Sequence, residues 1–324
     1  MAELWGLSIH PMLTVKEEKP FTSPEWIFEV KWDGTRALCH YDGGKFRLQN
    51  RRLYDTTYRY PDVRIVVKAK RAILDGEVVI MWEGQPSFEM LQKREHLTDA
   101  DDIARIAKRL PATYVAFDIL YLDGEDLTAK PLMERKRILA VTLEETESAV
   151  LSDYVERDGE TFYGICRERG LEGVIAKRKD SKYQIGKRSR DWKKIKALKT
   201  ADCVICGVTV GEGNRADTFG ALILGLYGDA GELHCVGRVG TGFDRGMVEL
   251  LHRRLAAIQS SMPFREQPPL AGEVKFWCRP ELVAEVEYLM FTPDIALRAP
   301  SFQRLKQDKD PRECGLPPDA VRRA

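Results

Sequence analysis

The sequence predicts an α+β protein of two domains: a larger domain with antiparallel sheets and flanking helices, followed by a smaller β-barrel. Up to about residue 199, segments with apolar residues at every second position alternate with segments of helical spacing. After Lys199 and Thr200 the pattern changes to short strands separated by glycine turns, with one helix. The length of 324 residues is enough for two domains of ordinary size. We therefore expect domains at residues 1–199 and 200–324.

The composition indicates a soluble chain that can bury cores of its own. Hydrophobic residues make up 44% and charged residues 31%, and no apolar run approaches the roughly 20 residues of a membrane span. Met1–Pro20 contains early acids and no cleavable signal pattern. The seven cysteines are an odd and scattered set, which is typical of reduced thiols in a cytoplasm. Cys203 and Cys206 would face opposite ways in a strand, and we interpret both as core residues.

Positive charge is concentrated in one segment. Lys177–Lys199 carries eleven lysines and arginines and two acids, a net charge of +9, so the rest of the chain carries −8 against a total of +1. A charge run is usually a solvated face, but here Tyr183, Trp192 and Ile195 interrupt the cations. We therefore expect a folded cationic surface that binds phosphates.

The first domain begins with an irregular lead-in, since Pro11, Pro20 and Pro24 break the chain before residue 27. Apolar and charged residues then alternate, which predicts a strand at Ile27–Trp32 that Gly34 ends. The other predicted strands are Ala37–Tyr41, Lys45–Gln49 (after a turn at Asp42-Gly43-Gly44), Ala72–Ile80, Tyr114–Leu122, Leu171–Arg178 and Trp192–Lys196, and the helices are Ser87–Glu95, Ala100–Arg109, Pro131–Leu143 and Gly159–Arg169.

The second domain reads as five or so strands with one helix in about 110 residues, which fits a small Greek-key barrel of the OB type. The spaced glycines of Gly207–Gly213 lack the strand-to-helix context of a phosphate loop, and we interpret them as a barrel loop. The predicted elements are Cys203–Val210, Ala221–Tyr227, Leu233–Val239, the helix Arg245–Gln259, Glu273–Cys278 and Leu282–Phe291.

The charged face of the first strand holds the main candidate site. Glu29, Lys31 and Asp33 share this face, and Arg36 lies just past the turn. Taken alone, the segment fits an edge strand with a solvated charged face. Its form, Lys-x-Asp-Gly-x-Arg, also resembles motif I of the covalent nucleotidyltransferases: ATP-dependent DNA ligases, RNA ligases and mRNA-capping enzymes. In that family the lysine is the nucleophile, which here is Lys31.

Further segments resemble the later motifs of this family, in family order. Leu74–Val79 is similar to motif III, Tyr114–Leu122 to motif IIIa, Leu171–Arg178 to motif IV, Asp191–Lys196 to motif V and the tail to motif VI. The resemblance implies catalysis by Lys31; ATP binding by Glu29, Arg36, Arg51, Phe117, Lys194, Lys196, Arg298 and Lys309; and binding of Mg²⁺ or Mn²⁺ by Glu77 and Glu172.

The chain departs from the family pattern at two places. DNA ligases often have Ser-Arg-Asn-Gly where this chain has Asn50-Arg51-Arg52, so the ribose or DNA contact of Arg51 stays open. Motif VI is typically Arg-x-Asp-Lys, but Lys306 replaces the leading arginine before Lys309. Lysine lacks the bidentate fork of arginine, which weakens the expected pyrophosphate contact. Arg298 is a supplementary cation.

Within the superfamily the sequence most resembles the ATP-dependent DNA ligases. Val30–Gly34 and Arg298–Phe302 are similar to the ligase module of prokaryotic non-homologous end joining. The resemblance implies a ligase-type nucleotidyltransferase (adenylation) domain at residues 1–199 and an OB-fold domain at 200–324. It also implies a stand-alone minimal ligase that is a monomer and seals 3′-OH/5′-phosphate nicks in duplex DNA through lysyl-AMP and DNA-adenylate. Ku-like and polymerase or phosphoesterase end-joining proteins would be its partners.

Three other functions remain open at this point. A capping-type guanylyltransferase shares the catalytic motifs but uses GTP, and an RNA ligase uses ATP on a different substrate. A non-enzymatic OB-fold protein that binds nucleic acid is a third possibility. The combination of Lys31 with Glu77 and Glu172 argues against the third.

Overall fold

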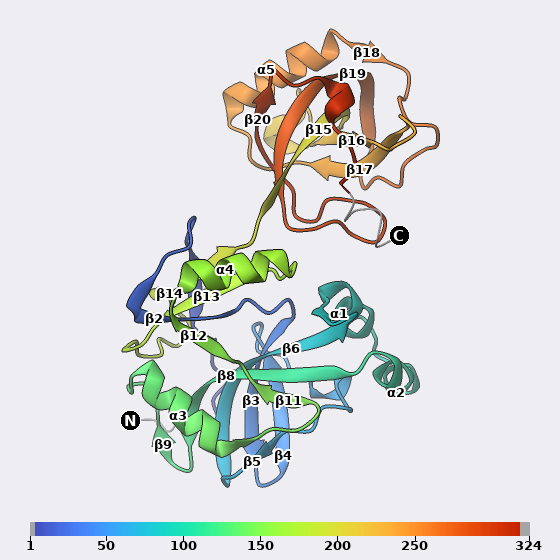
Figure 1. The fold of residues 1–324 in the computed structure, drawn as a ribbon. Helices are drawn as coiled ribbons and strands as arrows, with labels where there is room; N and C mark the ends of the chain where they lie inside the picture. Colours follow the sequence, from blue (N-terminus) through green and yellow to red (C-terminus); the bar gives the residue numbers. More distant parts are fainter. Residues whose placement is uncertain (1–3, 318–324) are drawn as a thin grey trace. The chain divides into compact units, whose positions relative to one another are not determined.

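The computed structural model describes residues 4–317, and the chain forms two compact units, Met1–Ala197 and Leu198–Ala324 (Figure 1). Each unit has buried apolar cores of its own. None of the helices in residues 4–317 is long and apolar enough to cross a membrane.

The first unit is built on two sheets that share a core. Leu38 and Ile73 of the larger sheet are buried in one cluster with Ile27 and Trp192 of the smaller sheet. The larger sheet runs in the order β11-β8-β6-β3-β4, with β7 beside β6 and β9 beside β8, and the smaller runs β1-β14-β13-β2-β12. The strands of the larger sheet are β3 (Thr35–Asp42), β4 (Lys45–Asn50), β6 (Arg71–Trp82), β7 (Gln85–Pro86), β8 (Ala112–Leu122), β9 (Glu125–Asp126) and β11 (Ala149–Leu151).

The smaller sheet carries most of the predicted catalytic segment. Its neighbours are antiparallel except for β1 and β14, which run parallel. Two short strands, β5 (Val66–Val67) and β10 (Leu143–Glu144), form a separate pair. The strands of the smaller sheet are β1 (Leu13–Lys16), β2 (Ser23–Val30), β12 (Tyr154–Arg157), β13 (Gly173–Arg178) and β14 (Arg188–Lys196).

Helices pack against both sheets of the first unit. The side chains of Ser87, Asp99, Asp158 and Asp244 accept hydrogen bonds from backbone N–H groups of the first turns, which explains where four of the helices begin. The five predicted helices are confirmed to within three residues at each end: α1 (Phe88–Glu95), α2 (Ala100–Arg109), α3 (Leu132–Thr142), α4 (Gly159–Glu168) and α5 (Arg245–Ala256).

The second unit is one six-stranded sheet with α5. The sheet runs in the order β17-β16-β15-β19-β18, and β20 also pairs with β19. Cys203 and Cys206 of β15 are both fully buried in its core, which confirms their interpretation. The strands are β15 (Lys199–Thr209), β16 (Leu222–Tyr227), β17 (Leu233–Val239), β18 (Gln259–Ser260), β19 (Val274–Tyr288) and β20 (Ser301–Lys306).

Two expectations about strands were wrong. The lead-in before residue 27 is not irregular, because β1 forms there and hydrogen bonds to β14: the N–H of Leu13 donates to the Lys187 carbonyl at 2.8 Å. The two segments expected at 273–278 and 282–291 form the single strand β19. Pro280 interrupts the apolar pattern there, and the pairing with β15 shifts register at that point.

Candidate active site

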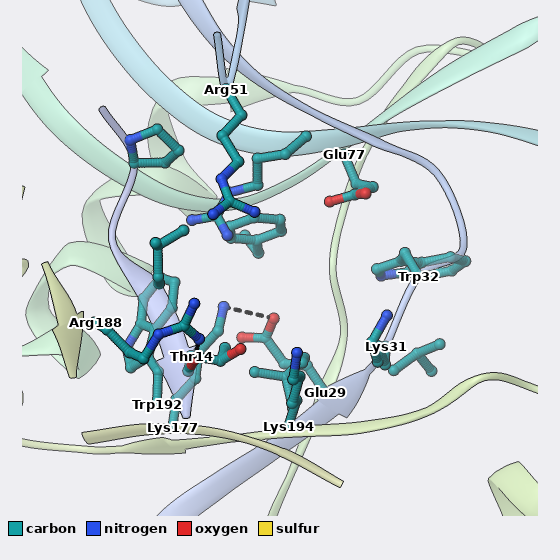
Figure 2. Close-up of a pocket in the computed structure, with 16 residues that line it drawn as sticks. Thr14, Glu29, Lys31, Trp32, Arg51, Glu77, Lys177, Arg188, Trp192 and Lys194 are labelled. Carbon is teal, nitrogen blue, oxygen red and sulfur yellow. Dashed lines mark hydrogen bonds and ion pairs between the residues drawn. The ribbon is translucent and has the colours of Figure 1, made fainter. Parts of the chain in front are cut away.

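A pocket of about 230 Å³ opens in the first unit, lined by residues of both sheets. Residues of β2, β6, β8, β13 and β14 supply its walls. Figure 2 shows charged side chains of both signs pointing into it. Seven of the predicted site residues line it: Glu29, Lys31, Arg36, Arg51, Glu77, Phe117 and Lys194.

Lys31 lies directly after β2, one residue before the end of the predicted strand Ile27–Trp32. Its backbone N–H donates to the Gly173 carbonyl at 2.9 Å, and its ammonium forms an ion pair with the carboxylate of Glu172. The next turn requires glycine at position 34, because a Cβ there would lie 2.2 Å from the Val78 carbonyl oxygen. This close approach brings the catalytic segment against β6, which carries Glu77.

Glu29 is buried in the pocket wall and does not stand in solvent. Its Oε2 accepts a hydrogen bond from Nζ of Lys177 at 2.9 Å, and its Oε1 lies 2.5 Å from Nζ of Lys136. Burial lowers the pKa of Lys177 to about 8, an effect that Glu29 opposes. Sequence reasoning missed both lysines as site residues. Lys136 lies in a helix with many charged residues, and no motif marks it as a site residue. Lys177 was noticed only as part of the basic segment.

Arg36 is held by a buried carboxylate. Its Nε and Nη2 donate to Oδ1 and Oδ2 of Asp75 at 2.7 and 2.6 Å. The hydroxyl of Tyr183 donates to the same carboxylate at 2.6 Å. The guanidinium lies 4.8 Å from the ring centre of Phe117, and the edge of Trp192 packs on that ring. Arg36 therefore faces the pocket from a fixed position.

Two carboxylates, Glu77 and Glu172, lie near Lys31. Burial raises the pKa of Glu77 to about 8, and Asp75 and Glu172 raise it further while Arg36 and Lys31 oppose this. No residue from 4 to 317 makes a hydrogen bond or ion pair with the Glu77 carboxylate. Glu77 is half-buried and lines the pocket, so its carboxylate is available to a cation that binds there.

This pair of carboxylates does not make a metal site by itself. Over residues 4–317, no group of three or more His, Cys, Asp or Glu side chains could hold a metal ion. Glu77 and Glu172 therefore fit a hard divalent cation only if oxygens of a bound ligand complete its coordination. A nucleotide phosphate supplies such oxygens.

Cations gather along β14 of the smaller sheet. Burial lowers the pKa of Lys194, and the nearby charges of Lys31, Lys196 and Arg188 lower it further. Lys196 is thus close enough to act on Lys194, although its side chain does not line the pocket. Arg188 lines the pocket and was not among the predicted site residues. Such a cluster of positive charge favours a bound phosphate.

The basic segment is only partly a free cationic surface. Lys177 pairs with Glu29, Lys179 with Glu156 and Lys193 with Glu17, and these carboxylates come from distant parts of the sequence. Arg178 pairs with its neighbour Asp180. The exposed cations that form no ion pair with any residue from 4 to 317 are Lys182, Lys187, Arg188 and Arg190.

Arg51, Arg298 and Lys309 differ in their surroundings. Arg51 is exposed in the turn after β4 and reaches the pocket (Figure 2). Arg298 and Lys309 belong to the second unit. There Lys309 forms an ion pair with Glu313 at 3.0 Å, and the N–H of Arg298 donates to the Met290 carbonyl at 2.9 Å.

Comparison with known proteins identifies the family. The model of the ATP dependent DNA ligase domain matches residues 11–196, and that of the ATP dependent DNA ligase C terminal region matches residues 215–309. The chain is 37% identical over 295 residues to the multifunctional non-homologous end joining DNA repair protein LigD of Mycobacterium tuberculosis, covering 89% of this chain and 37% of that protein. It is 33% identical over 332 residues to a DNA ligase of Thermococcus onnurineus, covering 95% of this chain and 57% of that protein.

Solved structures agree with this result. The structure of mycobacterial DNA ligase D complexed with ATP and MES matches with a TM-score of 0.52 and 32% identity, over 94% of this chain and 97% of that one. A Lig E DNA ligase matches with a TM-score of 0.60 and 19% identity, over 92% and 100%, which shows the shared fold. The expected α+β fold, a ligase-type nucleotidyltransferase domain followed by an OB-fold barrel, is confirmed. The chain belongs to the ATP-dependent DNA ligase family.

Proposed function

We propose that this chain is an ATP-dependent DNA ligase that seals nicks between a 3′-hydroxyl and a 5′-phosphate in duplex DNA. The observation that carries the proposal is Lys31 at the pocket, with Glu172 as its ion-pair partner and Lys194 nearby on the same sheet. One amine, acidic groups and phosphate-binding cations in one pocket are the groups that nucleotidyl transfer needs.

The reaction begins at Lys31. Its uncharged Nζ attacks the α-phosphorus of ATP, a P–N bond forms, the bond to the bridging oxygen breaks, and pyrophosphate leaves. Nζ loses a proton in this step. Lys194, which lies near Lys31, and Lys196 would offset the negative charge of the phosphates. An oxygen of the DNA 5′-phosphate then takes the AMP from Lys31. The bond between Nζ and the AMP phosphorus breaks in this transfer. Finally the 3′-hydroxyl attacks the phosphorus of the DNA 5′-phosphate, loses its proton, and AMP leaves.

The nucleotide is held by the other pocket residues. Glu29 accepts from the adenine amino group, and Phe117 stacks on the base. Arg36, fixed by Asp75, contacts the ribose, and Arg51 contacts the ribose or the DNA. All four residues line the same pocket, which supports these roles.

Glu77 and Glu172 would hold Mg²⁺ or Mn²⁺. The cation would neutralise phosphate charge as ATP binds. Lys31 and Glu172 form an ion pair. A cation bound at Glu172 would weaken this ion pair. The partnerless carboxylate of Glu77 supports this assignment.

The second unit supplies the pyrophosphate contacts. Residues 1–199 act as the adenylation domain and residues 200–324 as the OB-fold domain, whose Arg298 and Lys309 orient the leaving pyrophosphate. In this structure Lys309 forms an ion pair with Glu313, and this ion pair must break before Lys309 can contact pyrophosphate.

The named relatives support a cellular role, and this chain spans between about a third and three fifths of their length. The mycobacterial relatives are named for non-homologous end joining and DNA repair. We propose the same setting here: nicked duplex DNA as substrate, Ku-like and polymerase or phosphoesterase proteins as partners, and action as a monomer in the cytoplasm.

One experiment tests the activity. The chain is incubated with labelled ATP or labelled GTP and Mg²⁺ or Mn²⁺, and then nicked duplexes with DNA or RNA strands are added. A labelled adduct with ATP that is passed to a DNA nick is the expected result. An adduct with GTP alone would indicate a capping-type enzyme, sealing of RNA alone an RNA ligase, and no adduct a binding protein.

A further inference from the structure

A short connection between two strands carries the proposed nucleophile. Residues 31–34 lie between β2 and β3 and belong to neither strand. The backbone of Lys31 is hydrogen bonded to Gly173 of the smaller sheet, and Gly34 packs against the Val78 carbonyl of the larger sheet. Lys31 and Arg36, at the two ends of the 31–36 segment, both line the pocket. The conformation of this segment therefore sets where the amine and the guanidinium lie relative to one nucleotide.

Helix α1 contacts the 31–36 segment through both of its ends. At its start, the N–H of Phe88 donates to Oδ2 of Asp33 at 3.4 Å. At its end, Oε1 of Glu95 accepts a hydrogen bond from the hydroxyl of Thr35 at 2.5 Å. The buried hydroxyl of Tyr60 donates to the same oxygen at 3.3 Å. The contact between Thr35 and Glu95 is the stronger tie to the segment, because it is short and its acceptor is a carboxylate.

The helix that carries Glu95 is itself fixed. The guanidinium of Arg94, the residue before Glu95, is 1% exposed and donates to the two carboxylate oxygens of Asp62 at 2.9 and 2.5 Å. At the other end of α1, the N–H of Ser87 donates to the Ile80 carbonyl of β6 at 2.8 Å. The Glu95 carboxylate is therefore presented to the 31–36 segment from a rigid support.

Arg36 and Lys31 depend on this support to different degrees. Arg36 is held by two hydrogen bonds to the buried carboxylate of Asp75, so its position is set without α1. Lys31 forms an ion pair with Glu172, a partner that the proposed cation would take. During the reaction the place of Lys31 then depends on its own backbone, which belongs to the segment that Glu95 holds.

We propose that Glu95 is a positioning residue for the transfer of AMP to Lys31, and that it acts through the Thr35 hydroxyl by holding the 31–36 segment in the conformation in which Lys31 reaches the α-phosphorus. The inference rests on the proposed function. Glu95 lies outside the ligase-like motifs, and neither it nor Thr35 is among the residues of 4–317 that line the pocket. Because a displacement of about 1 Å can slow a reaction by about 100-fold, loss of this hydrogen bond should slow the transfer.

The test is a double-mutant cycle on adduct formation. Thr35→Val removes the hydroxyl, Glu95→Met removes the carboxylate, and the double variant removes both. Each single variant should slow single-turnover adduct formation at saturating ATP by about tenfold, while the calorimetric Kd for ATP stays within about threefold of the wild-type value. The double variant should be no slower than the slower single variant, because both changes remove the same contact.

Conservative variants and a matched control complete the test. Thr35→Ser keeps the donor and Glu95→Gln keeps an acceptor, so both should retain most of the wild-type rate. Glu89→Met is the control: Glu89 also belongs to α1 and forms an exposed ion pair with Lys93 at 3.6 Å, and its loss should not change the rate. All variants should seal a pre-adenylated nick at the wild-type rate, because Lys31 takes no part in that step.

Three results would overturn the inference: additive losses in the cycle, an equal loss of adduct formation and of sealing, or a wild-type adduct rate in Thr35→Val. If Glu95→Met melts below the assay temperature, the nearly isosteric Thr35→Val decides alone. Its selective loss of adduct formation supports the inference.

The failure of the proposed function looks different. A wild type that forms no adduct removes the ligase activity and the inference with it. A wild type that forms the adduct while Thr35→Val keeps its rate removes the inference alone.

Discussion

Lys31 and Glu172 are 141 residues apart in the chain, and their side chains form an ion pair at the pocket of the first unit. β2 and β13 are antiparallel neighbours, and Lys31 and Glu172 lie directly beyond the paired ends of these strands. The ion pair holds the Lys31 amine against Glu172, whereas nucleophilic attack needs this amine free to reach a phosphorus atom. The two proposed roles are therefore coupled, because a cation that takes Glu172 frees Lys31.

Replacing Lys31 should abolish the labelled adduct. Lys31→Ala removes the nucleophile, and Lys31→Arg does not rescue it because a guanidinium stays protonated. Lys31 and Glu172 are partly exposed, so the lost ion pair costs at most about 1 kcal/mol and leaves the fold intact. Both variants should still seal a nick that is supplied already adenylated. An adduct that survives in Lys31→Ala would contradict the assignment.

Metal dependence should change with pH through Glu77. Its pKa is raised to about 8, so below pH 8 a proton occupies the carboxylate and competes with the divalent cation. The Mn²⁺ concentration that half-saturates adduct formation should therefore fall as pH rises from 6.5 to 9. Glu77→Gln should need more Mn²⁺ and should lose this dependence, because its amide does not titrate.

Glu172→Gln provides the comparison in the same titration. It should also raise the Mn²⁺ requirement, and thermal melting should show both variants folded. If both variants are as active as the wild type at every Mn²⁺ concentration, neither glutamate is a metal ligand.

The fold could be predicted from the sequence because its strong elements carry local patterns. The strand that became β8 is apolar along its length, and α2 has apolar residues at helical spacing and a capping Asp99. β1 could not be predicted in the same way. It is four residues long and is hydrogen bonded to β14, more than 170 residues away in the chain.

The site could be predicted only in part. Lys31, Glu29 and Glu77 stand in short motifs, and all three line the pocket. Lys136 does not stand in any of the motifs, since its role depends on α3 packing against the sheet and reaching Glu29. The ion pair of Lys31 with Glu172 was likewise not predicted, because motif resemblance assigns a role to each residue separately.

DNA binding should depend on salt through the unpaired cations of the basic segment. Lys182, Lys187 and Arg188 are exposed and make no ion pair with any residue from 4 to 317. Each phosphate contact releases counterions, so replacing all three by glutamine should reduce the slope of log affinity against log salt by up to about 3. The measurement is binding to a nicked duplex at several salt concentrations.

A second triple variant controls for net charge. Arg178, Lys179 and Lys193 are replaced by glutamine, which removes the same three charges from residues that already have carboxylate partners. Its slope should stay closer to that of the wild type. If both triple variants change the slope equally, total charge explains the binding and the assigned surface is wrong.

Stability should depend on the buried carboxylate of Asp75. Asp75 is fully buried and holds Arg36 through two hydrogen bonds. Asp75→Asn removes the negative charge and leaves the guanidinium without its partner, which should cost about 3–5 kcal/mol in the free energy of unfolding. Asp180→Asn, which breaks the exposed pair with Arg178, should cost about 1 kcal/mol or less. Denaturant unfolding of both variants checks this, and equal losses would contradict the structural role of Asp75.

The last prediction concerns Lys309 in the second unit. If Lys309 orients the departing pyrophosphate, it is needed when Lys31 takes AMP from ATP and is not needed afterwards, because no pyrophosphate leaves in the sealing step. Lys309→Ala should therefore lose most adduct formation while sealing of a pre-adenylated nick largely persists. Lys309 is paired with Glu313 at 3.0 Å, so Glu313→Ala should release the cation and preserve both steps.

Arg304→Ala is the matched control for the Lys309 variant. Arg304 is another cation of the same tail, and it pairs with Glu285 at 2.9 Å. Since nothing assigns it to pyrophosphate, its loss should leave both steps near the wild-type rate. The measurement is single-turnover sealing of ordinary and pre-adenylated nicks by each variant. Normal sealing of ordinary nicks by Lys309→Ala, or an equal loss of both steps, would show that this lysine acts in some way other than on the leaving pyrophosphate.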